Sequence, residues 1–222
     1  MNENDSNRSV VIAKIRPGTA DDLRDLVSIH CCAFPNFFLT NLGTPFLRDY
    51  YRLILEYKEG ILLVASEAGQ QVGFAAGFMN PDGFYTRMRS RRYQLLVPIG
   101  LGLLQSPQLL PRVIAHGLRI SRGGDKSSRR GASSCEMASL GVDPKASGKG
   151  IGRLLVDAFI AESRQLGATE VYLTTDADGN ERVNTFYGRM GFARDRQFIA
   201  AGNRRMNEYS KPLAASQQHA SA

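Results

Sequence analysis

The stretch that decides the fold is Val142–Leu155, VDPKASGKGIGRLL, which joins an apolar segment to the start of a helix. Its glycines stand at positions 148, 150 and 152. Lys149 lies between two of them, and Lys145 precedes them. A strand that runs through glycines into a helix leaves backbone N–H groups unpaired at the positive end of the helix dipole, where phosphate oxygens bind well. The pattern therefore predicts an anion-binding turn, and a flexible turn that binds nothing is the alternative.

This turn is neither of the two common nucleotide-binding motifs. It lacks the Gly-x-x-x-x-Gly-Lys-Ser/Thr pattern of a P-loop. Its glycines alternate, and no acidic strand end follows at the spacing of the dinucleotide fingerprint.

The apolar pattern on both sides of the turn predicts a mixed α/β (α+β) fold with helices on both faces of a sheet. After the turn, a helix with one packed face is expected, because apolar residues recur at its i, i+3, i+4, i+7 and i+8 positions, Ile151, Leu154, Leu155, Ala158 and Phe159. Other strands are expected at 10–15, in a hairpin over 61–79 and at 170–175, with a final pair within 192–212; other helices are expected from Thr19, over 44–57 and from Asn180 to a stop at Gly191.

Length and composition predict a single domain over residues 1–222, since 43% of the residues are apolar. The polar tail from about 214 to 222 is expected to be disordered. No secretory signal pattern is visible at the amino terminus, so a cytoplasmic location is expected. The three cysteines are odd in number and lack metal-ligand spacing with the histidines, so neither a metal site nor a disulfide framework is expected.

The positive charge is concentrated in one segment. The net charge is +7, but residues 84–130 hold ten Lys or Arg against one acid, Asp125, so this segment carries +9 and the rest of the chain −2. Helical spacing broken by Pro98, Pro107 and Pro111 predicts short basic helices there. These helices could cover a substrate, bind a phosphorylated substrate such as a sugar nucleotide, contact an anionic membrane surface, or form a solvated cap. Nucleic acid is not expected as a partner.

Two motifs together resemble the paired signatures of the GNAT acetyltransferase superfamily. They are LGVDPKASGKGIGRLL, from Leu140 to Leu155, and NERVNTFYGRMGF, from Asn180 to Phe192. The resemblance covers about residues 10–80 and 132–212. It implies a central mixed, mostly antiparallel sheet with helices on both faces and a helical insertion, residues 84–130, between the third and fourth strands. It further implies acetyl transfer from acetyl-CoA to a primary amine by direct attack in a ternary complex, with a homodimer as a further expectation.

In the first signature, Gly150 and Gly152 match the family pattern Arg/Gln-x-x-Gly-x-Gly/Ala, whereas Ser147 stands where Arg or Gln is usual. The resemblance implies that the turn holds the diphosphate of acetyl-CoA through its amides, with Lys149 and Arg153 supplying positive charge. The residues expected at this diphosphate are Ser147, Gly148, Lys149, Gly150, Ile151, Gly152 and Arg153.

The strand before the turn is implied to hold the pantetheine arm. Leu140, Gly141 and Val142 would offer backbone groups in the gap where two neighbouring parallel strands splay apart, with the Leu140 N–H directed at the thioester carbonyl. Gly141 suits a bulge, because an irregular strand favours a residue without a side chain. The alternative is a plain core strand with a glycine in it.

In the second signature, Tyr187 occupies the family's tyrosine position and is implied to reprotonate the departing thiolate. A phenol with a pKa near 10 suits that role; a core aromatic is the alternative. Asn180 is implied to contact the cofactor, Phe186 to pack beside it, and Arg189 either to reach the adenosine 3′-phosphate or to remain solvated.

Glu136 matches the glutamate that many family members use as a base, directly or through water. Period-two alternation predicts that Glu136, Ala138 and Leu140 share one face of the strand. Burial would raise the pKa of the carboxyl into a range that suits a base. A structural or substrate-binding carboxylate is the alternative. Some relatives carry a glutamate at the end of the next strand instead, but here that strand ends in Thr174, Thr175 and Asp176.

These features favour an N-acetyltransferase acting on a small-molecule amine, such as an amino sugar. A catalytically silent acyl-CoA-binding module is the second hypothesis, because it needs the glycine turn but neither Tyr187 nor Glu136. A membrane-surface or nucleic-acid binding protein that uses residues 84–130 is the third. The aromatic stretch at 33–47 is expected beside the acceptor.

Overall fold

The computed structural model describes residues 13–35, 37–91, 130–200 and 203–214, and the account below concerns these residues. Their central layer is a seven-stranded sheet in the order β1-β2-β3-β4-β5-β7-β6. Its one parallel pairing joins β4 to β5, and the others are antiparallel. The predicted mixed, mostly antiparallel sheet is confirmed. The strands are β1 Lys14–Pro17, β2 Gly60–Glu67, β3 Gln70–Met79, β4 Ser134–Val142, β5 Glu170–Asp176, β6 Ala193–Ala200 and β7 Arg204–Pro212.

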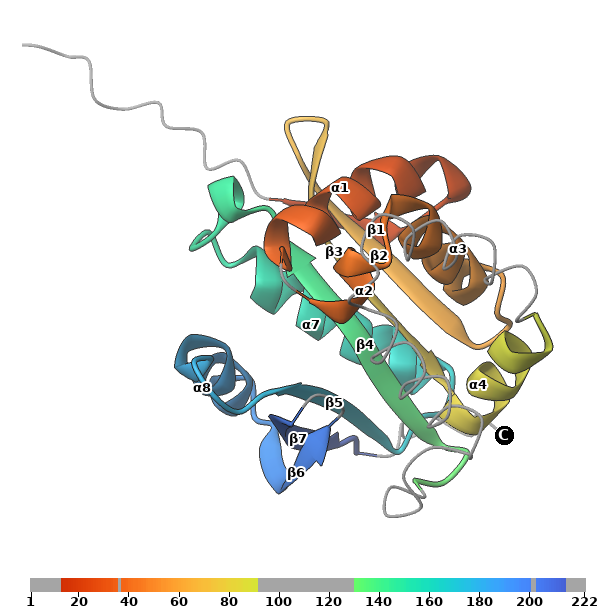
Figure 1. Ribbon diagram of the computed structural model, residues 1–222, viewed down its shortest axis with the longest axis vertical. Coiled ribbons are helices and arrows are strands. Elements are labelled where there is room, and N and C mark those ends of the chain that lie inside the picture. The colour runs from red at the N-terminus through yellow and green to blue at the C-terminus, as the bar shows by residue number, and fades with distance from the viewer. Residues whose placement is uncertain (1–12, 36, 92–129, 201–202, 215–222) are drawn as a thin grey trace, which may run out of the picture.

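Helices cover both faces of the sheet, as predicted (Figure 1). α1 and α3 pack on one face, and α7 packs on the other. The helical elements are η1 Ala20–Asp22, α1 Leu23–Ala33, α2 Phe38–Asn41, α3 Thr44–Leu55, α4 Pro81–Ser90, η4 Pro144–Ala146, α7 Ile151–Gln165 and α8 Glu181–Arg189. The first strand lies later than expected and runs through Pro17, which an edge strand tolerates.

The packed face of α7 differs from the prediction in one residue. Ile151, Leu155 and Phe159 are buried against the sheet as expected, but 38% of Leu154 is exposed. Val156 is fully buried instead. The buried stripe is therefore rotated toward the i+5 position, and the helix packs against β1, β2, β3 and β4.

A β-bulge in β4 changes which side chains face the site. Where β3 pairs with β4, Ala76 lies opposite Ser139 and Gly77 opposite Met137, so Ala138 has no partner across the ladder. A bulge of this kind shifts the side-chain alternation by one residue. Met137 before the bulge and Leu140 after it consequently pack with the same cluster, on the α7 side of the sheet, while Ala138 packs on the α1 side.

Two predictions about this strand are therefore wrong. Glu136, Ala138 and Leu140 do not share a face, since the bulge turns Leu140 to the α7 side. The irregularity lies at Ala138 and not at Gly141.

The parallel strands β4 and β5 separate after three residue pairs. Ser134–Glu136 pairs with Glu170–Tyr172, and no later residue of β4 pairs with β5. Beyond that point β4 continues along β3 to Val142, while β5 continues along β7 to Asp176. The sheet thus opens into two diverging halves, with α8 beside the second (Figure 1). The expected splay is present.

The predicted insertion begins with α4, Pro81–Ser90, which starts at the end of β3. Of residues 84–130, positions 92–129 lie outside the described residues, as do strand positions 10–12 and the tail from 215. In the described ranges, no helix combines the length and the apolar character needed to cross a bilayer. The same ranges hold no group of three or more His, Cys, Asp or Glu side chains that could bind a metal ion.

Candidate active site

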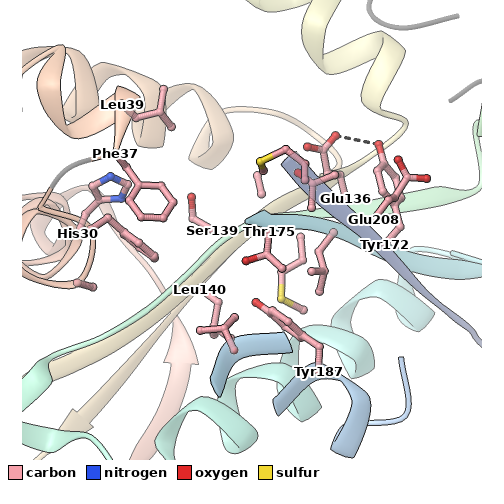
Figure 2. A pocket seen from close by; sticks show the side chains of 18 of the residues that line it. His30, Phe37, Leu39, Glu136, Ser139, Leu140, Tyr172, Thr175, Tyr187 and Glu208 are labelled. Atoms are coloured by element: carbon pink, nitrogen blue, oxygen red, sulfur yellow. Dashed lines mark hydrogen bonds between the residues drawn. The ribbon is translucent and has the colours of Figure 1, made fainter. Parts of the chain in front are cut away.

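A cavity of about 1570 Å³ lies where β4 and β5 separate. It extends from the glycine turn and α8 at one end to α4 and the α1–α2 segment at the other, and Figure 2 shows its lining side chains. Gly141 and Lys149 are not among its lining residues. The other predicted site residues line it together: Glu136, Leu140, Val142, Ser147, Gly148, Gly150, Ile151, Gly152, Arg153, Asn180, Phe186, Tyr187 and Arg189.

The glycine turn presents a row of free backbone amides. Gly148 and Gly150 have φ values of +85° and +81°, a left-handed conformation that favours glycine. Within the described chain, no amide from Gly148 to Arg153 donates a hydrogen bond; the first that does is Leu154 N, to Gly150 O at 3.1 Å. These amides stand at the N-terminus of the fifteen-residue helix α7. The turn can therefore bind an anion, as its sequence predicted.

One cation beside this turn, Arg182, was not predicted from the sequence. Lys149 pairs with Glu67 at 2.7 Å, and the Arg153 side chain is 75% exposed. Arg182 on α8 donates a hydrogen bond from Nη2 to Ser147 Oγ at 3.1 Å. Ser147 is the position where the family pattern has Arg or Gln, so Arg182 brings a guanidinium to the turn from another element.

Gly141 is required by packing against the neighbouring strand. A Cβ at this position would lie 2.5 Å from Cε1 of Phe74, which is fully buried. The glycine therefore lets the Phe74 ring lie against β4, and its φ is not in the left-handed region.

Gly141→Ala should lower the free energy of unfolding by about 2 kcal/mol, as overpacking of a dense core does. Urea unfolding followed by circular dichroism measures it. Gly131→Ala is the matched control, because nothing lies within 4 Å of a Cβ there. Equal stability of the Gly141 variant and the wild type would contradict the packing argument.

Tyr187 points into the cavity beside Leu140 (Figure 2). Its ring packs against Phe186, Phe192 and Tyr209, with centroid distances of 5.2, 5.8 and 6.1 Å. Burial raises the pKa of the phenol, so it holds its proton at neutral pH. Among the described residues the Tyr187 hydroxyl makes no hydrogen bond, which leaves its proton available for a ligand.

Hydrogen bonds connect the end of β5 to the N-terminal end of α8 and to β7. The Asn180 amide donates to Thr175 Oγ1 at 2.8 Å and to Asp176 O at 3.3 Å. Asp176 is held by Arg204 through two hydrogen bonds of 2.7 Å and one of 3.0 Å. The carboxylate of Asp176, the last residue of β5, is therefore ion-paired with Arg204. This pairing agrees with Glu136, rather than Asp176, as the candidate base. A contact of Asn180 with the cofactor stays a prediction.

Glu136 is held by two tyrosines. Tyr172 donates a hydrogen bond to Oε2 at 2.8 Å (Figure 2). Tyr85 on α4 donates to Oε1 at 3.0 Å. Burial raises the pKa of Glu136 above its ordinary 4.5, the two phenols act in the opposite direction, and the charge of Glu208 raises it further.

A buried ion-pair cluster supports this carboxylate from the side of β7. Glu208 is 4% exposed and accepts hydrogen bonds from Arg130 at 2.7 Å and from Arg196 at 3.0 Å. The Arg130 guanidinium also pairs with Glu170 and Asp195 and lies 4.6 Å from the centre of the Tyr172 ring. Arg130, counted in the basic segment, therefore belongs to the structural support of the site and is not a free surface charge.

His30 lines the same cavity from α1. It recurs at helical spacing with Leu23, Leu26 and Val27, which indicates one buried face, and it is 3% exposed. Its Nδ1 lies 2.6 Å from the Tyr51 hydroxyl, and desolvation lowers its pKa from 6.5 to about 4.

The lowered pKa of His30 predicts a loss of stability in acid. Below pH 6.5 the His30 imidazole is protonated in the unfolded chain, whereas in the folded chain it stays neutral until about pH 4. The free energy of unfolding therefore falls as the pH drops through this window. The loss reaches about 3 kcal/mol at 1.36 kcal/mol per pKa unit. Denaturant unfolding at pH 7, 5.5 and 4.5 should show this loss for the wild type and not for His30→Phe; parallel pH curves would contradict it.

Residues of this site that were not assigned from the sequence are Tyr85, Tyr172, Glu208, Arg130 and Arg182. Each is placed by a partner at least 35 positions away in the chain. No local motif marks them. The spacing of His30 in the sequence indicates that it lies on the buried face of α1, but it does not indicate that His30 belongs to a functional site.

Solved structures with the same fold include proteins named as acetyltransferases. A ribosomal-protein-alanine N-acetyltransferase from Brucella melitensis aligns with a TM-score of 0.60 and 20% identity over 90% of this chain and 99% of that chain. Ard1 from Thermoplasma volcanium aligns with a TM-score of 0.59 and 15% identity over 91% and 98%. A Salmonella typhimurium protein, solved with its cofactor acetyl-CoA, aligns with a TM-score of 0.58 and 17% identity over 91% and 95%. At these identities the likeness shows the fold alone.

A family model matches part of the sequence. Residues 113–192 match the model of the acetyltransferase (GNAT) family, and this range includes the glycine turn and the whole second signature. With this match and the shared fold, the resemblance to GNAT acetyltransferases drawn from the two signatures is confirmed.

Curated relatives match over shorter regions. A mycothiol acetyltransferase from Propionibacterium freudenreichii is 47% identical over 58 residues, which are 26% of this chain and 18% of that protein. Another from Kocuria rhizophila is 37% identical over 98 residues, 44% of this chain and 31% of that protein. The match thus spans less than a third of the length of these relatives.

Proposed function

We propose that the protein transfers the acetyl group of acetyl-CoA to the primary amine of a small molecule. The observation that carries the proposal is the row of free amides from Gly148 to Arg153, at one end of a cavity that has a buried carboxylate at the other. The names of the curated relatives are in keeping with N-acetylation of a small molecule.

The residues present fit acetyl-CoA. Amides Gly148–Arg153 and Arg182 would hold the diphosphate, and Arg189 at the end of α8 would meet the 3′-phosphate. Beyond Glu136, the edge of β4 that faces β5 has no strand partner in the described sheet, so backbone groups of Leu140–Val142 are available for the pantetheine arm. When bound, acetyl-CoA supplies the acyl group as a thioester.

Two side chains would move the protons. Glu136 takes a proton from the acceptor ammonium, directly or through water, so that the amine can attack. The amine nitrogen bonds to the thioester carbon, the C–S bond breaks, and Tyr187 gives its phenolic proton to the departing sulfur. The second proton that the nitrogen loses as the amide forms returns to the Tyr187 oxygen, directly or through water, so the phenol is restored. The Leu140 N–H would stabilise the charge that develops on the carbonyl oxygen.

A catalytically silent acyl-CoA-binding module is the second candidate, because the free amides alone would serve it. Thiol release from acetyl-CoA, measured with a panel of amino sugars, polyamines, amino-acid amides and peptides, separates the two. Release with at least one small amine is expected. Tight acetyl-CoA binding without release across the panel would favour the module. The cytoplasmic location, a homodimer and the role of residues 92–129 stay predictions.

Arg182→Gln should raise the KM for acetyl-CoA about fivefold with kcat little changed, since one charge-assisted hydrogen bond to a phosphate on an open surface is lost. Steady-state kinetics at saturating amine measures this. Arg164→Gln, an exposed arginine at the far end of α7, is the matched control. An unchanged KM for acetyl-CoA would mean that Arg182 does not reach the diphosphate.

A further inference from the structure

An unpaired polar atom lies in the apolar wall of the cavity. His30 Nε2 is buried and makes no hydrogen bond within the described chain. The side chain is 97% buried, yet it lines the cavity (Figure 2). A buried nitrogen without a partner costs about 1–3 kcal/mol, so its retention in a cavity points to a ligand that pairs with it.

Hydrogen bonds on the Nδ1 side of the ring determine the tautomer of His30. Ser139 hydrogen-bonds the Tyr51 hydroxyl, and that hydroxyl lies 2.6 Å from His30 Nδ1. With the Ser139 hydroxyl donating to Tyr51 O, the Tyr51 proton is directed at Nδ1. The imidazole then carries its own proton on Nε2, which makes this atom a hydrogen-bond donor.

The surroundings of this donor are aromatic. The His30 ring lies 4.9 Å from Phe34 and 6.3 Å from Phe74, and Phe37 packs on Phe34 at 5.1 Å. Among the described residues of α1 and α2 that line the cavity, His30 alone carries a side-chain hydrogen-bond donor. A single fixed donor in an apolar pocket gives orientation and specificity to a ligand. Because His30 is neutral at pH 7, it does not repel a cationic amine.

We propose that His30 is a specificity-determining residue: its Nε2–H donates a hydrogen bond to a carbonyl or hydroxyl oxygen of an acceptor that otherwise carries an apolar body. The inference rests on the proposed function, because it takes the α1–α2 end of the cavity as the acceptor side. Its acceptor class is an apolar amine with one oxygen near the amine, such as an aromatic amino-acid amide.

The test compares two amines that differ in one group, L-phenylalaninamide and 2-phenylethylamine. The wild type should use the amide with the higher kcat/KM. His30→Asn keeps a polar atom at the Nδ1 position for Tyr51 but removes the Nε2 donor, so the preference should fall about tenfold. His30→Gln places an amide N–H near the Nε2 position and should restore part of it. An unchanged preference in His30→Asn overturns the inference.

A measurement without turnover separates this inference from the proposed function. In protein labelled with ¹⁵N-histidine and saturated with CoA, L-phenylalaninamide should shift the Nε2 resonance of His30, whereas Arg182→Gln should leave that shift unchanged in size. No shift at saturating amide, or no binding of the amide, overturns the inference. A normal shift with no acetyl transfer to any amine contradicts the proposed function alone and supports the inference.

Discussion

Tyr187→Phe should lower kcat about 100-fold and leave the affinity for acetyl-CoA nearly unchanged. Loss of a positioned general acid costs about 10²–10⁴ in rate. The ring of Tyr187 packs against Phe186 and Phe192, and its hydroxyl has no partner in the described chain, so the variant keeps the packing and loses only the proton donor. Thiol release measures kcat, and calorimetry with CoA measures binding.

A neighbouring tyrosine provides the matched control. Tyr209 is equally buried, at 7% exposure, but its hydroxyl donates to Asn184 Oδ1 at 3.0 Å and belongs to the contact between β7 and α8. Tyr209→Phe should therefore reduce stability slightly and leave kcat within about threefold of the wild type, as loss of one neutral hydrogen bond predicts. Wild-type turnover in Tyr187→Phe would remove that residue from the mechanism.

Glu136→Gln should lower kcat/KM for the amine about 100-fold at neutral pH and flatten its rise in the acid range. The base works as a carboxylate, so the rate of the wild type increases as the pH rises through the pKa of Glu136. Burial raises that pKa above 4.5, which moves the acidic limb to higher pH than a solvated glutamate would give. The glutamine has nearly the same shape and cannot take a proton.

The pH profile decides between a base and a merely structural carboxylate at Glu136. Tyr172→Phe removes one of the donors that oppose the raised pKa, so it should move the acidic limb further upward while kcat at high pH is kept. Two results for Glu136→Gln would contradict its role as base. One is a pH profile of kcat/KM with the same acidic limb as the wild type, and the other is a loss of activity explained entirely by a lower melting temperature.

Features that depend on neighbours in the chain could be predicted from the sequence. The glycines before Ile151 indicated the turn, the two apolar runs within 61–79 indicated the hairpin, and Gly167 ends α7 with φ +84°. Local pattern also located both family signatures. Each of these depends on backbone conformation and apolar spacing over fewer than about twenty residues, which is the range that such patterns report.

The residues that the sequence analysis placed wrongly lie where packing between neighbouring strands determines the conformation. The bulge at Ala138 comes from the pairing of β4 with β3, and no residue of β4 alone marks it; its effect is to turn Leu140 to the other face. Gly141 was explained by a bulge, whereas the ring of Phe74 on the adjacent strand requires it.

The electrostatics of the site could not be predicted for the same reason. Arg182 reaches Ser147 across 35 positions, and Arg130 reaches Glu208 across 78. Charge counted along the chain placed Arg130 on a basic surface, but the fold places it beside Tyr172 in an ion-paired cluster. Long-range pairs of this kind follow from topology and leave no periodic pattern.

The central claim is that the amides of Gly148–Arg153 bind the diphosphate of acetyl-CoA. ¹H–¹⁵N correlation spectra of the labelled protein, recorded during titration with CoA, test it most directly. The account predicts that these amide resonances move downfield together and saturate with the binding curve. Amides of this turn that stay in place while CoA binds elsewhere, or does not bind at all, would contradict it.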